Sequence, residues 1–388
     1  MKFKRVFLMV LDSVGVGETA DAANFKDTGA NTLGHINQKC DLFIPNLKKI
    51  GFLDTLNMSE NRDVDAYYTI AKPINAGKDS LNGHYELIGV KNDIPFKTFN
   101  NSFPYEILNS VELVTGRRVI GNKCCSDDSI LNELGDRQIS YGSLIVYTSA
   151  DSDLQVAAHE DCIPIETLHE YCQRISDLNH DQNWRIGRII ARPFTGTTGK
   201  YHFVASGRRD FAVNPPKSTI LNELDQNNYN VIGIGRINDM FNRQGINKVI
   251  KATNNSEAIN KLLDIMDKSF TGLCMVNLPD FDGLYGHTRD VEGYASALEE
   301  LDVDIPILLN KLELDDVLII TADHGNDPTF GGNDHTRENV PVIIYSRNFK
   351  HSRRLEVFDT MANIGATIAE NFSLQAPEIG KSILNDLE

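Results

Sequence analysis

Short runs of apolar residues recur along the chain, and each has the length of a β-strand. A run that is apolar throughout is typical of a strand buried on both faces. These runs cover residues 6–11, 144–147, 231–234, 273–278, 317–320 and 342–345. They predict a sheet whose strands lie inside the protein.

Apolar residues take helical spacing between several of these runs. Residues 255–268 place them at Ile259, Leu262 and Met266, and residues 292–312 and 359–372 show the same period. One apolar stripe along each helix allows it to pack against a sheet. Strands that alternate with helices predict an α/β fold with a mainly parallel sheet flanked by helices.

The middle of the chain has a different pattern. Residues 121–129 have a loop-like composition, and residues 193–207 are rich in turn residues. A helical pattern at 165–178 lies between strand-like segments at 144–147 and 188–191. The length of 388 residues also exceeds that of one simple domain. We therefore predict two domains, a core made of residues 1–94 and 212–388 and an inserted smaller α/β cap domain at 95–211.

The first residues have only part of the pattern of a secretory signal. Basic residues precede the apolar run at 6–11, but Asp12 ends it, whereas a signal needs roughly 7–15 apolar residues. No other run approaches the ~20 apolar residues of a membrane span. None of the six cysteines forms a Cys-x-x-Cys pair, so we expect free thiols in a reducing compartment. The expected location is the cytoplasm.

The charge of the chain excludes two classes of partner. There are 38 Lys and Arg residues against 54 Asp and Glu residues, which gives a formal net charge of −16. Such a chain is repelled by the phosphates of nucleic acids and by anionic membrane surfaces. We expect neither as a partner, and the sequence leaves the oligomeric state open.

Carboxylates and imidazoles gather just outside the predicted core strands. The residues in question are Asp12, Asp282, His287, Asp323, His324 and His335. Ligands of open α/β sheets bind outside the carboxyl ends of the strands, and we expect four such ends here to carry these residues, the fourth being that of the strand at 342–345 beside His335. This set of oxygen and nitrogen donors suits Mn²⁺ or Zn²⁺ better than Ca²⁺, and its size suits two ions. Taken singly, each Asp also fits a helix N-cap and each His a structural role.

A hydroxyl nucleophile is the next requirement of such a site. Residues 77–86, Gly-Lys-Asp-Ser-Leu-Asn-Gly-His-Tyr-Glu, read as a turn followed by the start of a helix. Ser80 would lie near the helix N-terminus, where backbone N–H groups favour phosphate. A serine hydroxyl becomes a good nucleophile when a metal or a base activates it. Read in isolation, Ser80 is more simply a helix N-cap, with Gly83 in a turn.

Several motifs together resemble those of the phosphopentomutases, a family of the alkaline-phosphatase superfamily. They include Val-Leu-Asp-Ser-Val-Gly-Val-Gly-Glu (10–18), Asn-Thr-Leu-Gly-His (31–35), Gly-Lys-Asp-Ser-x-x-Gly-His-x-Glu (77–86) and Tyr-Thr-Ser-Ala-Asp-Ser (147–152). Others are Gly-Arg-Ile-Ile-Ala-Arg-Pro-Phe (187–194), Asp-Phe-Asp…Gly-His…Arg-Asp (280–290), Thr-Ala-Asp-His-Gly-Asn-Asp-Pro (321–328) and Asp-His-Thr-Arg-Glu (334–338). The resemblance covers nearly the whole chain.

The resemblance implies an alkaline-phosphatase-like core that holds two Mn²⁺ ions, or another divalent metal, beneath an inserted cap. Asp12, Ser80, Asp323 and His324 would surround one ion, and Asp282, His287 and His335 the other. The family nucleophile, a phosphorylated threonine, falls on Ser80, and a sugar bisphosphate primes it. The implied reaction is the isomerisation of ribose or deoxyribose 1-phosphate and 5-phosphate, so the partner would be a small sugar phosphate. Cap contacts to this substrate map onto Asp151, Arg188 and Arg208.

This chain departs from the family pattern mainly in the expected cap. Residues 125–128 read Cys-Ser-Asp-Asp, Asp153 stands where an apolar residue is usual, and Tyr-His-Phe-Val at 201–204 lacks a family arginine. The metal ligands match, whereas the substrate-facing positions differ. A phosphomutase or phosphatase acting on a different sugar phosphate therefore remains an alternative, as does neutral drift of these loops. A non-catalytic protein that retains the fold is a further alternative, which the intact ligand set disfavours.

Overall fold

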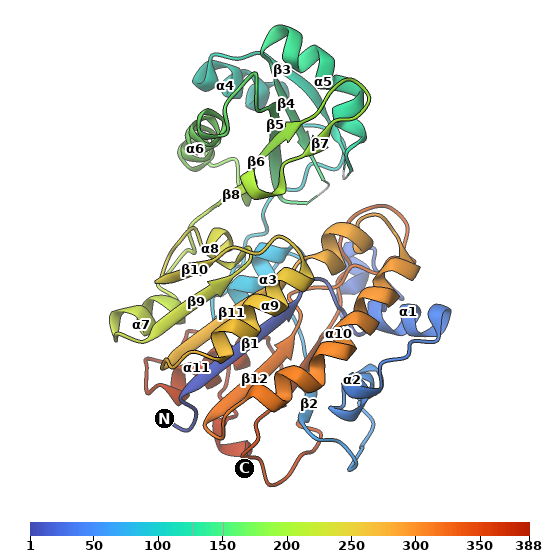
Figure 1. Ribbon diagram of the computed structural model, residues 1–388, viewed down its shortest axis with the longest axis vertical. Helices are drawn as coiled ribbons and strands as arrows, with labels where there is room; N and C mark the ends of the chain where they lie inside the picture. Colours follow the sequence, from blue (N-terminus) through green and yellow to red (C-terminus); the bar gives the residue numbers. More distant parts are fainter. Residues whose placement is uncertain (126, 150) are drawn as a thin grey trace. The chain divides into compact units, whose positions relative to one another are not determined.

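We describe the protein from a computed structural model that covers residues 1–125, 127–149 and 151–388. Ser126, in the divergent stretch 125–128, and Ala150, in the motif at 147–152, lie outside the described residues. The chain divides into two compact units (Figure 1). The core unit contains Met1–Pro95, Pro215–Asn238 and Arg243–Glu388, and the inserted unit contains Phe96–Asn214 and Asp239–Asn242.

A seven-stranded sheet, counted over the described residues, forms the centre of the core unit. Its order is β10-β9-β11-β1-β12-β13-β2, with β10 to β12 parallel and β13 antiparallel to both of its neighbours. The strands are β1 (Arg5–Leu11), β2 (Tyr67–Ala71), β9 (Asn230–Ile234), β10 (Lys248–Ile250), β11 (Gly272–Leu278), β12 (Asp316–Thr321) and β13 (Val340–Tyr345). Every residue of β1, β11 and β12 is buried, because helices cover both faces of the sheet.

The core helices form two groups, one around α10 and one around α11. In the first group α10 contacts α1, α2 and α9, and in the second α11 contacts α3 and α7. Figure 1 shows α9 and α10 in front of the sheet and α11 behind it. The bounds are α1 (Thr32–Cys40), α2 (Pro45–Lys49), α3 (Ser80–Leu87), α7 (Ile220–Gln226), α9 (Asn255–Met266), α10 (Val291–Lys311) and α11 (Ala362–Asn371). The short helix α8 (Ile237–Met240) includes residues of both units.

The inserted unit has its own sheet, with the order β3-β4-β5-β6-β7 and β8 paired to β6. Its strands are β3 (Val119–Cys124), β4 (Leu144–Thr148), β5 (Asp153–His159), β6 (Arg188–Thr195), β7 (His202–Phe203) and β8 (Arg209–Ala212). The helices α4 (Tyr105–Thr115) and α6 (Ile165–Asp181) pack on one face, and α5 (Ser129–Tyr141) packs on the other. Two separate apolar clusters, one on each face, hold these layers together.

The predicted α/β fold with a mainly parallel core sheet is confirmed. One detail of the prediction is wrong, because residues 121–129 were expected to be a loop, yet β3 includes Gly121 to Cys124. Its polar, half-exposed residues lack the apolar run of a buried strand. All six cysteines are free thiols. Within the described ranges, we find no helix with the length and apolar character that a membrane crossing requires.

Candidate metal centre and nucleophile

The sheet brings the six candidate ligands to one edge. Leu11 pairs with Leu278, and Val10 pairs with Thr321, so β1, β11 and β12 end at the same level. Asp12, Asp282 with His287, and Asp323 with His324 follow these three carboxyl ends. His335 reaches the same edge from a different side, because β13 is antiparallel and His335 precedes its amino end. The expectation that this fourth strand would also present its carboxyl end is therefore wrong.

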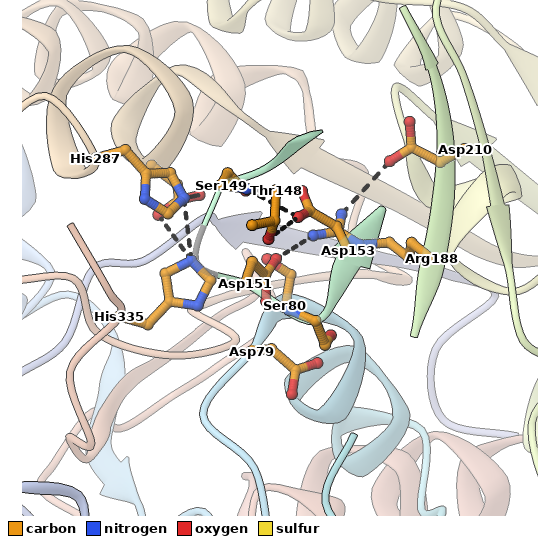
Figure 2. Close-up of polar contacts among 12 residues, drawn as sticks. Asp79, Ser80, Thr148, Ser149, Asp151, Asp153, Arg188, Asp210, His287 and His335 are labelled. Atoms are coloured by element: carbon orange, nitrogen blue, oxygen red, sulfur yellow. Dashed lines mark hydrogen bonds and ion pairs between the residues drawn. The ribbon is translucent and has the colours of Figure 1, made fainter. Parts of the chain in front are cut away.

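One group of possible ligands contains Asp282, His287 and His335. One ligand atom from each lies within 4.8 Å of the others. Figure 2 shows the two imidazoles facing each other, and their Nε2 atoms are 3.3 Å apart. The His287 Nε2 lies 3.2 Å from Asp282 Oδ2, and the His335 Nε2 lies 3.5 Å from Asp282 Oδ1. The π-helical turn η4 (Phe281–Gly286) carries Asp282 and leads into His287, and such turns are frequent at functional sites.

A second group contains Asp12, Asp282 and His324. The His324 Nε2 lies 3.4 Å from Asp12 Oδ1 and 3.4 Å from Asp323 Oδ2, so Asp323 borders the same space. Asp282 therefore belongs to both groups, whereas the sequence comparison had placed it beside one ion only. A carboxylate with two oxygens can serve two neighbouring cations.

The donor atoms fit a divalent cation. Asp12 Oδ1 and Asp323 Oδ2 are buried, and no described residue donates a hydrogen bond to either oxygen. Buried polar atoms are normally satisfied, and three carboxylates facing three imidazoles match the oxygen and nitrogen donors that Mn²⁺ and Zn²⁺ accept. These residues can therefore hold one metal ion per group, with Asp282 shared.

Residues behind the ligands fix their orientation, and sequence reasoning missed them. Arg236 Nη2 and Asn277 Nδ2 each donate to Asp12 Oδ2 at 3.0 Å, which leaves Asp12 Oδ1 for a cation. Such partners hold ligands in the binding geometry. Asn277 was visible as the one polar residue in the apolar run 273–278, and Arg236 as a charge just after the run 231–234.

The Asp323 side is supported by α3. The His84 ring is buried, and its Nδ1 lies 2.8 Å from the Ser80 carbonyl oxygen and 3.1 Å from Asp323 Oδ2. Gly83 faces the same loop, and a Cβ there would lie 2.1 Å from the Asp323 carbonyl oxygen. The helix approaches the metal loop so closely only because position 83 is glycine.

The charges within the site shift the pKa values of Asp282 and His324 in opposite directions. Burial raises the pKa of Asp282, but the His287 and His335 imidazoles lower it more, so it lies well below the ordinary carboxylate value. Burial lowers the pKa of His324, whereas Asp323, Asp12 and Asp282 raise it, and the net pKa lies well above the ordinary histidine value. The three carboxylates around His324 therefore favour its protonated form in the metal-free protein.

Metal binding is expected to release this proton. A cation at His324 competes with the proton, so the apparent metal affinity should rise with pH by up to about tenfold per unit below the raised pKa. Calorimetric titration of the metal-free protein with Mn²⁺ in buffers of different ionisation enthalpy measures the proton count. We expect release of about one proton per bound pair of ions. An affinity independent of pH and buffer would contradict this assignment of His324.

The candidate nucleophile lies beside the second group. Ser80 is 2% exposed, and its Oγ is 3.0 Å from His324 Nε2. It is the first residue of α3, whereas Asp79 is the N-cap and accepts a hydrogen bond from the Asn82 N–H at 3.1 Å. The interpretation of Ser80 as an N-cap is therefore wrong, which frees its hydroxyl for the site.

The three expected substrate residues of the inserted unit form one ion-pair network there. Figure 2 shows Arg188 between Asp151 and Asp210. Arg188 contacts Asp151, and its Nη1 lies 3.5 Å from Asp210 Oδ2. Arg208 binds the same Asp210 through Nε at 2.8 Å and Nη2 at 3.0 Å. Burial lowers the pKa of Arg208, but Asp210 raises it above the ordinary value. Asp210 thus links Arg188 to Arg208, a role that sequence reasoning did not assign.

Comparison with protein families identifies the group to which these features belong. The model of the Metalloenzyme superfamily matches residues 4–376. The chain belongs to this superfamily. Membership agrees with the ligand groups described above and makes a divalent metal the expected cofactor of this metalloenzyme.

Solved structures similar to this metalloenzyme share little sequence with it. Phosphoglycerate mutase of Leishmania mexicana is 11% identical, with a TM-score of 0.49 over 98% of this chain and 97% of that one. The PH0037 protein of Pyrococcus horikoshii is 14% identical, with a TM-score of 0.48 over 98% and 100% of the two chains. An alkaline phosphatase superfamily protein of Vibrio parahaemolyticus is 11% identical, with a TM-score of 0.44 over 99% and 70%.

Proposed function

We propose that the protein is a phosphopentomutase, an isomerase that interconverts ribose or deoxyribose 1-phosphate and 5-phosphate through phosphorylated Ser80. The observation that carries the proposal is the position of Ser80. Its hydroxyl lies 3.0 Å from His324, beside two ligand groups that share Asp282, at the start of a helix. The pentose specificity rests on the motif resemblance described above.

The ligand residues would hold two Mn²⁺ ions or related divalent ions. Asp12, Asp323, His324 and Ser80 would hold one, and His287 and His335 the other, with Asp282 reaching both. Bound ions of this kind stabilise a deprotonated hydroxyl and the charge of a transferring phosphoryl group. The backbone N–H groups at the start of α3 add to the binding of phosphate oxygens.

The proposed reaction balances as two exchanges at Ser80. A sugar bisphosphate first transfers one phosphoryl group to Ser80 Oγ: its C–O–P bond breaks at phosphorus, and the departing sugar monophosphate takes the Ser80 proton on the freed oxygen. The bond between Ser80 Oγ and phosphorus then breaks while the sugar C1 hydroxyl oxygen bonds to phosphorus, and that hydroxyl's proton passes to Ser80 Oγ. The resulting bisphosphate returns its 5-phosphate to Ser80, which restores the phosphoenzyme and leaves ribose 1-phosphate. We propose that this occurs in the cytoplasm and that the inserted unit acts as the cap, with Asp151, Arg188 and Arg208 contacting the sugar.

A second candidate is a phosphomutase or phosphatase for another sugar phosphate. It is favoured by the inserted unit, where Arg188 and Arg208 are already paired with Asp151 and Asp210. Arginines that are neutralised in this way bind a further anion less strongly.

The test is an assay of the Mn²⁺-loaded enzyme with ribose 5-phosphate and a catalytic amount of glucose 1,6-bisphosphate. Phosphorus NMR distinguishes ribose 1-phosphate from inorganic phosphate. We expect isomer and no net release of phosphate. Release of phosphate without isomer would identify a phosphatase. Turnover of a hexose phosphate in preference to ribose 5-phosphate would show that the substrate is a hexose phosphate and not a pentose phosphate. Absence of any phosphoryl transfer would reject the enzyme proposal.

A further inference from the structure

One face of the inserted unit's sheet carries a second group of polar side chains. Tyr147 on β4 lies directly opposite Gln155 on β5, and Arg192 on β6 pairs with Ala157, two residues further along β5. Paired residues share a face and alternate residues of a strand return to it. Tyr147, Gln155 and Arg192 therefore project from one face, the face on which α5 packs.

Two of these side chains are buried with an oxygen atom that is not satisfied. Tyr147 is 2% exposed and Gln155 is 6% exposed. In the described part of the chain, no group forms a hydrogen bond with Tyr147 Oη or with Gln155 Oε1. The Gln155 amide is fixed by its other end, because Nε2 donates to Asp153 Oδ2 at 2.7 Å. Buried polar atoms of this kind indicate a missing partner.

Arg192 provides the positive charge of this group. Its guanidinium lies over the Phe203 ring, 3.9 Å from the ring centroid. Arg188 and Arg208 are paired with carboxylates, whereas no carboxylate of the described residues lies within 4.0 Å of Arg192. Stacking on Phe203 holds the plane of the guanidinium and leaves its edge of N–H donors available.

None of the three described acids near Arg192 forms an ion pair with it. Burial lowers the pKa of Arg192, and Asp210, the carboxylate that raises it most, is already paired with Arg188 and Arg208. Asp153 is occupied by neutral donors. They are Thr148 Oγ1, the Ser149 N–H and Ser149 Oγ (Figure 2), together with Gln155 Nε2. Asp128 is exposed to solvent, which screens it. Burial raises the pKa of Tyr147, so its hydroxyl remains protonated and can donate.

We propose that Arg192, Tyr147 and Gln155 form a binding subsite for the non-reacting phosphate end of a sugar phosphate. Arg192 and the Tyr147 hydroxyl donate to phosphate oxygens, and Gln155 Oε1 accepts a hydrogen bond from a sugar hydroxyl. A planar guanidinium with free N–H groups matches the oxygens of a phosphate. The choice of a sugar phosphate as the ligand rests on the proposed function, whereas the subsite itself rests on the contacts above.

The subsite can be tested without catalysis. Full-length protein stripped of metal with EDTA is titrated calorimetrically with ribose 5-phosphate and, separately, with ribose. Arg192→Gln should weaken binding of ribose 5-phosphate by about tenfold or more, because it removes a charge-assisted contact. Tyr147→Phe should weaken it by about fivefold, since one hydrogen bond to the phosphate is lost. Ribose without phosphate should bind equally weakly to all variants.

Arg209→Gln is the matched control. Arg209 lies over the Phe211 ring at 4.5 Å and pairs with Ala191, which places it on the opposite face of the same sheet. It should bind ribose 5-phosphate like the wild type, and thermal unfolding should show that every variant is folded. Equal affinity of Arg192→Gln, Arg209→Gln and the wild type would overturn the subsite. Since no turnover is measured, a failed mutase assay leaves this result unaffected.

Discussion

Ser80→Ala is expected to abolish turnover while leaving the metal content and the fold unchanged. Removal of a nucleophile on which both half-reactions depend should lower kcat by about 10⁴-fold or more. The fold should persist, because Asp79 rather than Ser80 caps α3. Isomerisation of ribose 5-phosphate gives kcat, elemental analysis gives the metal content, and intact-mass spectrometry after incubation with the sugar bisphosphate shows whether a phosphoryl group has been added.

Ser80→Thr is the matched variant for this prediction. Threonine keeps the hydroxyl and is the residue that the phosphopentomutase motif carries at this position. We expect it to retain phosphorylation and much of the activity, although the added methyl group enters a buried position. If Ser80→Ala kept near-wild-type turnover or still gained the mass of a phosphoryl group, another residue would be the nucleophile and the proposed reaction path would be wrong.

The core strands could be predicted because both of their faces are buried. The runs at 6–11, 273–278 and 317–320 correspond to β1, β11 and β12 with small differences at their ends. The direction of β13 could not be predicted in this way, because an apolar run looks the same in parallel and antiparallel pairing. The edge strands β2 and β10 were missed, the latter being only three residues long.

The strand β5 was missed for a reason that bears on function. All seven of its residues are buried, yet Asp153 and Gln155 interrupt the apolar pattern. Sequence reasoning treats such polar residues as exposed. In the structure Asp153 is satisfied by donors of its own unit, and Gln155 belongs to the proposed phosphate subsite. The two polar residues that interrupt the apolar pattern of β5 therefore lie on a buried polar face, which is a candidate for function.

The candidate site could be predicted as a set of residues but not as a geometry. The three aspartates and three histidines are visible in the sequence beside predicted strand ends, and the carboxyl ends of parallel strands share one edge of a sheet. The sharing of Asp282 is not visible, since it depends on a π-helical turn that no simple period predicts. The support of Asp12 by Arg236 and Asn277 likewise depends on the register of β9, β11 and β1.

The net charge of −16 gains a local meaning from this geometry. Asp12, Asp282 and Asp323 lie together around His324, and Arg236 is the cation that contacts Asp12. Three carboxylates without metal would repel a phosphate. With two divalent cations bound, the same acids leave the centre with a net positive charge. The acidity from which we expect no nucleic-acid partner is thus compatible with the proposed phosphate substrate.

Asp282→Asn is expected to lower binding of both proposed ions, because Asp282 is the residue that both ligand groups contain. The amide keeps the size of the side chain, and its oxygen can still accept from Asn326 Nδ2, which lies 2.7 Å from Asp282 Oδ1. It removes the charge that the two ions would share. We expect the metal affinity to fall by more than about 100-fold, the most that loss of an outer-shell partner typically costs. Elemental analysis after dialysis measures the change.

Two comparison variants test whether the loss of metal comes from the sharing of Asp282 by both ligand groups or from any substitution near the centre. His287→Ala removes a ligand of one group only and should leave about one ion per chain. Asp280 lies two residues from Asp282, but its carboxylate accepts a hydrogen bond from the Asn255 N–H at 2.8 Å and belongs to neither ligand group. Asp280→Asn should therefore retain the full metal content. Loss of a single ion from Asp282→Asn would place Asp282 in one group alone. Unchanged metal content in Asp282→Asn would show that Asp282 is not a metal ligand. The proposed ions beside Ser80 would then not share a carboxylate.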